Sequence, residues 1–508
     1  MLIEVRETKT RGKAVVATRR LEPGLSGLEV ITEKALIIFP TLGRGYGNED
    51  GPVPDFLEPN PQLFSDWCRY LEQPKDVQSR ILGLYTDMKC PHANALRDYL
   101  HQYECQFKEQ ESNQRNKAAE RIFSDVEEFV QFTMVIRFNS VELQPPAEDG
   151  HGPGPNYGHG LFELACKMNH SCRPNCVWFT TQDGKCKEVR AIAPIEAGEE
   201  LTVDYVGNVL DPTPQRREDL FATKGFVCEC DRCSAEHDDT RRFKCIAHSE
   251  TQCTGFHFLD QPTYSSTAFL VDCSCCGAKA TEEYTQTVMQ EEIALVREIN
   301  ELDEALDLDC IVNVQDRIEQ LQPPHRYHSL AEKCYQLKGE LYSNLGEYEC
   351  AAEAYAKSLD CRIYILGTDY YSQGTAFICE KLGDALKHVN VEEAEEAYKR
   401  AVRCLELMRG AADEDPYVKC AMKKLLTVQN RRFHIDDLPK ETKLKGIAEI
   451  GLKNPPPSDF SCQLCGNPAM IPSASRDALS YCCEFHKRVH YANVKRSCGL
   501  IEEEKTWD

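Results

Sequence analysis

The pattern of hydrophobic and polar positions changes character along the chain. Residues 1–45 alternate short apolar runs with glycine and proline, which predicts small strands joined by turns. Over residues 46–135 the apolar residues recur at helical spacing, as at Leu63 and Trp67. We therefore expect compact β structure that is interrupted by a helical insertion.

A segment rich in proline and glycine, residues 144–160, is too irregular for a helix or a strand. After it, apolar runs typical of strands return at 176–181, 188–195 and 200–205. We expect residues 136–208 to complete the β domain that the insertion interrupts.

Beyond residue 280 the pattern is mostly helical and partly repeats itself. Gly339 and Gly383 are 44 positions apart, and the Glu-Ala-Tyr triplets that end at Tyr355 and Tyr398 are 43 apart. This period is longer than the ~34 residues of a standard tetratricopeptide unit, but it is compatible with stacked helical hairpins. We expect a tetratricopeptide-like helical domain at 281–445.

Composition narrows the class of protein. The chain has 508 residues, 42% of them hydrophobic and 28% charged, which predicts a globular protein of two or more domains. No apolar run approaches the ~20 residues of a membrane span, so we expect no membrane segment. The N-terminus lacks the apolar stretch of a secretory signal, so we expect the 27 cysteines to lie in the cytoplasm or the nucleus. Thiols in such reducing compartments bind metal more often than they pair.

The net charge also limits the choice of partner. A formal charge of -23 argues against direct binding of nucleic acid, which depends on clustered lysine and arginine. An acidic protein favours basic substrates, but such an excess is more often a solvated surface that promotes solubility. Charge alone therefore identifies no partner.

Three motifs carry specific chemistry. Residues 169–175 are Asn-His-Ser-Cys-Arg-Pro-Asn, and residues 198–205 are Gly-Glu-Glu-Leu-Thr-Val-Asp-Tyr. Cys228, Cys230 and Cys233 follow in a Cys-x-Cys-x2-Cys pattern. Together these segments resemble the two signature motifs and the post-SET zinc segment of SET methyltransferases.

The resemblance is strongest to the SET- and MYND-domain family of protein lysine methyltransferases. The tripeptide Gly-Leu-Phe at 160–162 precedes Asn169 at the family's spacing, and a helical repeat domain follows the zinc segment. The resemblance covers roughly residues 1–440. It implies an α+β fold, in which a knot-like SET site lets the cofactor and the target lysine meet from opposite faces.

The same resemblance implies S-adenosylmethionine as the methyl donor. It places cofactor contacts at Arg11, Lys13, Asn139, Asn169, His170, Tyr205 and Phe226. In the N-terminal cofactor loop, Ala14 replaces the second glycine of the family's Gly-x-Gly pattern, and its Cβ excludes some backbone conformations.

The active-site tyrosine of the family corresponds to Tyr205. The resemblance implies that its hydroxyl orients the substrate amine in a dry channel during an in-line methyl transfer. A single tyrosine or a single Asn-His pair is more often a packing feature, so only the joint spacing of the motifs supports these roles.

Zinc is the second implied cofactor. The metal prefers four tetrahedral ligands, so Cys228, Cys230 and Cys233 require a fourth. The family supplies the fourth ligand from the first motif, at Cys172.

A second candidate zinc site lies in the same post-SET zinc region, which we place at 209–280. It resembles a small zinc ribbon and comprises Cys245, Cys253, Cys273 and Cys276. Two alternatives stay open at this point. The thiols can instead act as small buried hydrophobic groups, and Cys275 competes with Cys276 as a ligand.

The C-terminal segment 446–508 resembles a MYND zinc finger with half of its ligands missing. Its candidate ligands are Cys462, Cys465, Cys482 and His486. On a helix, Cys482 and His486 would share one face at positions i and i+4. Val494 stands where the histidine of the second MYND site is expected.

The expected function is methylation of a lysine on a protein substrate, either a histone or another protein. The competing hypothesis is a catalytically weak scaffold that binds protein partners through helical repeats and zinc modules. The intact Asn169, His170 and Tyr205 favour the enzyme, whereas Ala14 and the incomplete finger favour the scaffold. Neither the substrate nor the number of methyl groups is encoded in a motif.

Overall fold

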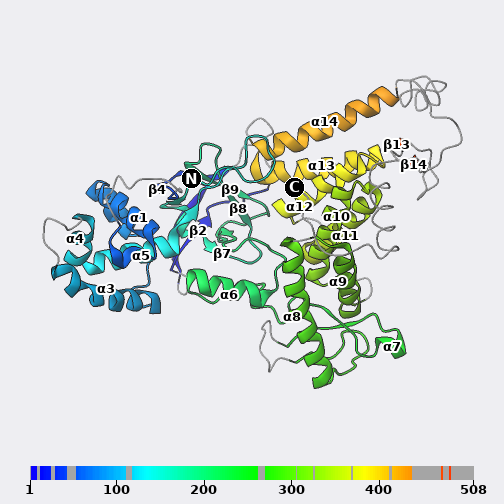
Figure 1. The fold of residues 1–508 in the computed structure, drawn as a ribbon, viewed down its shortest axis with the longest axis horizontal. Coiled ribbons are helices and arrows are strands. Elements are labelled where there is room, and N and C mark those ends of the chain that lie inside the picture. Colours follow the sequence, from blue (N-terminus) through cyan, green and yellow to red (C-terminus); the bar gives the residue numbers. More distant parts are fainter. Residues whose placement is uncertain are drawn as a thin grey trace.

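The structure is a computed structural model that describes residues 2–8, 12–23, 29–42, 53–109, 117–260, 269–304, 306–323, 327–367, 370–410, 415–436, 471–472 and 480–481. The described chain forms three regions in a row (Figure 1): a helical insertion at one end, small β-sheets in the middle, and a second helical domain at the other end. The predicted α+β fold class is confirmed.

The middle region is built from several small sheets. Strands β1 (Ile3–Thr8) and β2 (Gly12–Ala17) form an antiparallel hairpin. One three-stranded sheet has the order β3 (Glu29–Lys34), β9 (Cys186–Ala191), β8 (Cys176–Thr180), and another has the order β4 (Ile37–Phe39), β6 (His159–Leu161), β5 (Val141–Glu142). After the short 3₁₀ helix η3 (Ala165–Lys167), strand β7 (Asn169–His170) pairs in parallel with β10 (Thr202–Val203). This parallel pair brings the two motif segments side by side.

The β1–β2 hairpin shows how the backbone accommodates Ala14 in place of the expected glycine. Ala14 lies within β2 opposite Arg6, where the backbone is extended. Among the described residues other than glycine, only Gln252 has a positive φ. The Cβ of Ala14 is therefore accommodated without backbone strain, and the residue is fully buried.

The insertion has its own aromatic core. Its helices are η1 (Asp55–Leu57), α1 (Pro61–Leu71), α2 (Lys75–Leu82), α3 (Pro91–Glu109), α4 (Lys117–Ser124) and α5 (Val126–Asn139). The fully buried Trp67 stacks on Tyr70 at 5.1 Å and meets Phe129 edge-on at 5.1 Å. Helix α5 continues past the expected boundary at residue 135, because its last turn packs against α6 of the post-SET region.

The post-SET region contains a helix that the sequence patterns did not predict, α6 (Thr213–Lys224). It ends at Gly225, whose φ of 75° lets its N–H bond the carbonyls of Leu220 and Phe221. The remaining elements of this region are β11 (Phe243–Lys244), α7 (His248–Thr251) and β12 (Phe256–His257).

The second helical domain consists of repeated hairpins. Its helices are α8 (Glu282–Glu304), α9 (Leu308–Leu321), α10 (Ser329–Leu345), α11 (Tyr348–Leu366), α12 (Gln373–Leu386), α13 (Val391–Arg409) and α14 (Pro416–Asp436). A Cβ on Gly339 would lie 2.6 Å from the Tyr355 ring, and one on Gly383 would lie 2.7 Å from the Tyr398 ring. The sequence repeat therefore corresponds to equivalent glycine–tyrosine contacts in successive hairpins, α10–α11 and α12–α13.

The helical domain packs against the middle region through specific contacts. The Arg409 guanidinium lies 4.3 Å from the centroid of the Phe179 ring, and Arg173 donates to the carbonyl of Leu366 at 2.9 Å. Farther along the chain, β13 (Ile471–Pro472) pairs with β14 (Ser480–Tyr481). In the part of the chain that the structure describes, no helix is both long and apolar enough to cross a membrane.

Candidate active site and metal centres

Tyr205 lies just after β10, on the wall of a pocket of about 420 Å³. Its ring stacks on Trp178 at 5.8 Å, and its hydroxyl donates to the carbonyl of Met168. Burial, together with the charges of Cys166 and Glu200, raises the pKa of Tyr205. The hydroxyl therefore stays protonated at neutral pH and can position a partner by hydrogen bonding, but it is not a phenolate base.

His170 connects this tyrosine to the first cysteine cluster. Its Nδ1 accepts a hydrogen bond from the backbone N–H of Tyr205 at 3.1 Å, so the ring proton is on Nε2. Nε2 lies 3.2 Å from the Sγ of Cys172 and donates to it. The buried imidazole thus joins the Tyr205 backbone to the sulfur of Cys172.

Asn169 connects the first hairpin to the same motifs. Its Nδ2 donates to the Oε1 of Glu200 at 2.6 Å and to the carbonyl of Lys13 at 3.1 Å. Phe226 completes the surroundings, because its ring lies 6.4 Å from that of His170. Four of the expected cofactor residues, Lys13, Asn169, His170 and Phe226, are therefore neighbours around the β7–β10 pair.

Asn139 is the last residue of α5 and is buried. Its Nδ2 donates to the carbonyls of Tyr85 and Val135, at 2.8 and 2.9 Å. Its own carbonyl accepts from the Cys166 thiol at 3.1 Å. The side-chain amide therefore holds the end of α5, and a contact between Asn139 and a cofactor stays a prediction. Arg11 lies outside the described residues.

The chemistry of these groups fits the expected cofactor. S-adenosylmethionine carries a carboxylate, an amine and an adenine ring. Lys13 offers an ammonium group, Asn169 an amide and Phe226 an aromatic ring, which are suitable partners for those three groups.

An ion pair that the sequence analysis missed supports the turn that carries Tyr205. The fully buried Arg216 donates through one Nη to the Oδ1 of Asp204 at 2.7 Å and through the other to the carbonyl of Asn208. Among the described residues the Oδ2 of Asp204 has no hydrogen-bond partner. Asp204 belongs to the second motif, so the sequence could have indicated a role for it. Arg216 belongs to no motif, so its role could not be predicted from the sequence.

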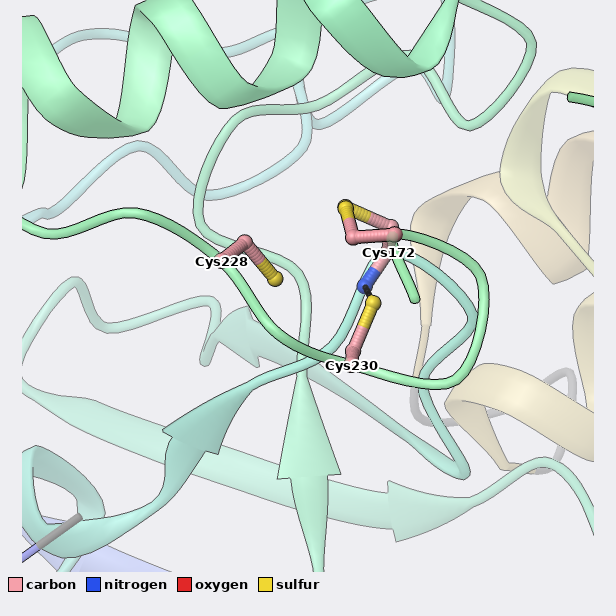
Figure 2. A group of neighbouring side chains, drawn as sticks. Cys172, Cys228 and Cys230 are labelled. Atoms are coloured by element: carbon pink, nitrogen blue, oxygen red, sulfur yellow. Dashed lines mark hydrogen bonds between the residues drawn. The ribbon is translucent and has the colours of Figure 1, made fainter. Parts of the chain in front are cut away.

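The first cysteine cluster unites residues from both motif regions. The sulfurs of Cys172, Cys228, Cys230 and Cys233 all lie within 4.8 Å of one another, and all four residues are buried. Figure 2 shows Cys172 approached by Cys228 and Cys230 from the post-SET segment, and the backbone N–H of Cys172 donates to the Sγ of Cys230 at 3.4 Å. The sulfurs of Cys172 and Cys233 are 3.6 Å apart, close to the ~3.8 Å edge of a tetrahedron with Zn–S bonds of ~2.3 Å. This donor set fits zinc.

The second cluster unites Cys245, Cys253, Cys273 and Cys276. Sulfur separations of 3.5 Å for Cys245–Cys276 and 3.8 Å for Cys253–Cys273 again match a zinc tetrahedron. A Cβ on Gly255 would lie only 2.6 Å from the sulfur of Cys273, so this glycine allows the close approach of the two segments. Cys275 is exposed and does not belong to the cluster.

The third candidate set, Cys462, Cys465, Cys482 and His486, lies outside the described residues. It stays a prediction.

Two adjoining pockets lie between the middle region and the helical domain. The second has a volume of about 450 Å³. Trp178, Asp204 and Gln373 line both pockets. We call these two adjoining pockets the groove; Tyr205 lines the first of them, and residues of the second helical domain line both.

Comparison with known proteins agrees with this geometry. Residues 12–206 match the family model of the SET domain, so this part of the chain is similar to a SET domain. It resembles SET- and MYND-domain proteins in particular. A SET and MYND domain-containing protein of Dictyostelium discoideum is 30% identical over 111 residues, which is 22% of this chain and 32% of that protein.

Other relatives carry names that state an activity. N-lysine methyltransferase SMYD2 of Gallus gallus is 37% identical over 87 residues, 17% of this chain and 19% of that protein. Histone-lysine N-methyltransferase SMYD3 of Mus musculus is 39% identical over 82 residues, 16% of this chain and 18% of that protein. The chain thus matches about a third or less of the length of these relatives.

Proposed function

We propose that this protein is an S-adenosylmethionine-dependent protein lysine methyltransferase. The observation that carries the proposal is the parallel pairing of β7 with β10, which brings Asn169 and His170 next to Tyr205, and Tyr205 lines the 420 Å³ pocket. The names of the SMYD2 and SMYD3 relatives support the same reaction class.

When bound, the cofactor supplies a methyl group on a positively charged sulfur. In this proposal Lys13, Asn169 and Phe226 hold it next to the β7–β10 pair. Trp178 and the ring of Tyr205 form an aromatic wall that excludes water from the amine. The protonated Tyr205 hydroxyl orients the lysine amine, and the main contribution of the protein is alignment.

Acidic residues of the groove would attract a lysine side chain of the substrate. Asp204 lines both pockets and Glu142 lines the one that holds Tyr205, so two carboxylates lie along the pockets that an incoming ammonium group would enter. The substrate in this proposal is a lysine-containing segment of a protein, either a histone or another protein, lying between the SET domain and the helical repeats. The tetratricopeptide-like repeats would provide further surface for protein partners.

Zinc has a structural role in this proposal. Held by Cys172, Cys228, Cys230 and Cys233, it would fasten the post-SET segment to the motif strand that bears His170. The second cysteine cluster would hold another ion, and the C-terminal segment a third in a MYND-like finger. The reduced thiols that these sites require agree with a cytoplasmic or nuclear location.

The test combines cofactor binding with turnover. Asn169→Ala and His170→Ala should abolish the binding of S-adenosylmethionine in calorimetry. Tyr205→Phe should bind the cofactor normally but lose roughly a hundredfold or more in methylation rate on peptide arrays, because one positioned polar contact is missing. Tyr348→Phe, a tyrosine stacked on His388 in the helical domain, is the matched control.

The outcomes separate the two function hypotheses. Unchanged cofactor affinity in the Asn169 and His170 variants would show that the cofactor site is misplaced. No cofactor binding by the intact, zinc-loaded protein would instead support the scaffold that acts through its helical repeats and zinc modules.

A further inference from the structure

A lysine of the protein itself lies at the candidate active site. Lys224 is the last residue of α6, and its Nζ is 5.7 Å from the centroid of the Tyr205 ring. The same Nζ donates to the carbonyl of Phe138, the neighbour of Asn139, at 3.4 Å. Lys224 and Tyr205 line the same pocket. A primary amine is therefore placed between the candidate active-site tyrosine and the end of α5.

The position of Lys224 is fixed by the docking of α6 on α5. Arg137 donates to the carbonyl of Ala222 at 2.7 Å, two residues before Lys224. The next residue, Gly225, packs so closely on Phe138 that a Cβ there would lie 3.3 Å from the ring. Lys224 is thus a partly buried side chain on an anchored helix end, and its direction toward Tyr205 follows from that anchor.

Burial shifts Lys224 toward the neutral amine. It contacts a carbonyl and an aromatic ring, and within the described residues it forms no ion pair with a carboxylate that would offset the burial. Burial lowers the pKa of Lys224, the charge of Cys166 opposes this, and the nearby Arg137 cation lowers the pKa further. Only the neutral form has the lone pair that attacks a methyl group.

We propose that Lys224 is an internal methyl acceptor, modified by the active site in which it lies. This inference rests on the proposed methyltransferase function. In the step itself, the Lys224 ammonium first releases a proton to water. The Nζ lone pair then forms the N–CH₃ bond while the S–CH₃ bond of S-adenosylmethionine breaks, and the sulfur keeps the bonding pair as a neutral thioether.

Lys187 provides a matched comparison in the same pocket. Its Nζ donates to the Oγ1 of Thr180 at 2.9 Å and lies 6.0 Å from the Trp178 ring. Burial, opposed by the charge of Glu142, lowers the pKa of Lys187 to about 8. If a depressed pKa alone selected the acceptor, Lys187 would be methylated; if placement beside Tyr205 selects it, Lys224 will be.

The experiment uses the full-length, zinc-loaded protein and S-adenosylmethionine with a trideuterated methyl group. Peptide mass spectrometry should find the label on Lys224, and Lys224→Arg should abolish it. Tyr205→Phe should reduce labelling at least roughly a hundredfold, as for an external substrate. Lys399→Arg, at an exposed position of α13 that lines neither pocket, should leave it unchanged. Label on Lys187, or label only on surface lysines, would overturn the proposal.

A second measurement does not depend on turnover. Brief acetylation with acetic anhydride, with and without S-adenosylhomocysteine, reports whether the Lys224 amine faces the cofactor product. Occupancy should reduce acetylation of Lys224 severalfold and leave Lys187 unchanged. Equal acetylation of Lys224 in both conditions would contradict its placement.

The failure of this inference can be told apart from failure of the proposed function. If the cofactor binds and peptide substrates are methylated while Lys224 stays unmodified, the inference is wrong and the function stands. If calorimetry detects no cofactor binding, both are wrong. Zinc content and circular dichroism of Lys224→Arg verify that this variant is folded.

Discussion

The two cysteine clusters have the same donor set but different places in the molecule. The first joins Cys172, from the motif strand region, to three cysteines more than 50 residues later in the chain. The second draws all four cysteines from residues 245–276, and one of them, Cys276, is exposed. A metal ion bound at the first would therefore fasten distant segments together, whereas one bound at the second would stabilise a local fold.

The hydrogen bonds around the two clusters also differ. The sulfur of Cys172 accepts from His170, and His170 in turn accepts from the backbone of Tyr205. The contacts of the second cluster are local, such as the N–H of Gly255 donating to the Sγ of Cys253 at 3.4 Å. The same set of four cysteines thus lies beside the candidate active site in one case and within a local segment in the other.

The largest effect is expected for Cys230→Ser, which removes one soft ligand from the first cluster. The variant should lose one zinc ion per chain and, because the post-SET segment would detach from His170, more than roughly a hundredfold in methylation rate. Zinc is counted by atomic emission, and the rate is measured with radiolabelled cofactor. Cys350→Ser, an exposed cysteine on α11, serves as the control. Full activity in zinc-free protein would remove the distinction between the clusters.

The second prediction concerns the ion pair that anchors the chain between the clusters. Arg241 pairs with Glu292 of α8 at 2.5 Å, and both side chains are buried. Glu292→Gln removes the carboxylate charge that faces Arg241, which should lower the free energy of unfolding by about 3–5 kcal/mol at pH 7. Glu291→Gln, which touches only the half-exposed pair with Arg317, should cost about 1 kcal/mol or less. Urea denaturation measures both.

The same pair predicts a pH dependence. Burial alone would raise the pKa of Glu292, but the charge of Arg241 and hydrogen bonds from His328 and Arg241 lower it from 4.5 to about 2. Because the pKa is lower in the folded state, the pair contributes fully above pH 4.5 and its contribution is lost as the pH falls toward 2. The stability difference between wild type and Glu292→Gln should therefore shrink over that window, and a difference that stays constant from pH 7 to pH 2.5 would contradict this assignment.

A smaller effect is expected for Cys273→Ser in the second cluster. The variant should also lose one zinc ion, and its melting temperature should fall by several degrees, because a local metal-bound loop loses its order. Methylation by the folded protein should change little, because no contact links this cluster to Tyr205 or His170 among the residues described. A loss of activity as large as that of Cys230→Ser would show that both clusters support the active site.

The sequence was sufficient where the chemistry demands particular residue types at a fixed spacing. The Cys-x-Cys-x2-Cys pattern predicted three members of the first cluster, the family resemblance added Cys172, and the four cysteines of the second cluster were predicted as a candidate zinc ribbon. The motif segments predicted the neighbourhood of Asn169, His170 and Tyr205. The glycine–tyrosine periodicity indicated the helical hairpins, because a ring packed on a helix leaves no room for a Cβ. In each case a short sequence pattern reflects one physical requirement, such as metal coordination or close packing of a ring on a helix.

Features that arise from packing between distant elements could not be predicted in this way. Lys224 faces Tyr205 only because α6 docks on the end of α5. The contact of Trp178 with Tyr205 depends on where β8 lies relative to β10. Arg216 pairs with Asp204, but Arg216 belongs to none of the recognised motifs, so the sequence did not indicate this ion pair. These residues look like ordinary surface or packing positions until the tertiary structure brings them together.

The smallest effect is expected for substitution of Cys275, and comparing it with Cys276 tests which of the two adjacent thiols is the fourth ligand of the second cluster. The sequence left Cys275 and Cys276 as competing ligands, since either could follow Cys273 in a metal-binding turn. Both thiols are exposed, but the structure brings only Cys276 into the cluster, with its sulfur 3.5 Å from that of Cys245. Cys275→Ser should therefore keep the full zinc content and the wild-type melting temperature, whereas Cys276→Ser should lose one ion. Because the two variants remove the same thiol one position apart, any general effect of losing a cysteine cancels in the comparison. Equal zinc loss in both would mean that the turn exchanges ligands, and loss only in Cys275→Ser would reverse the assignment.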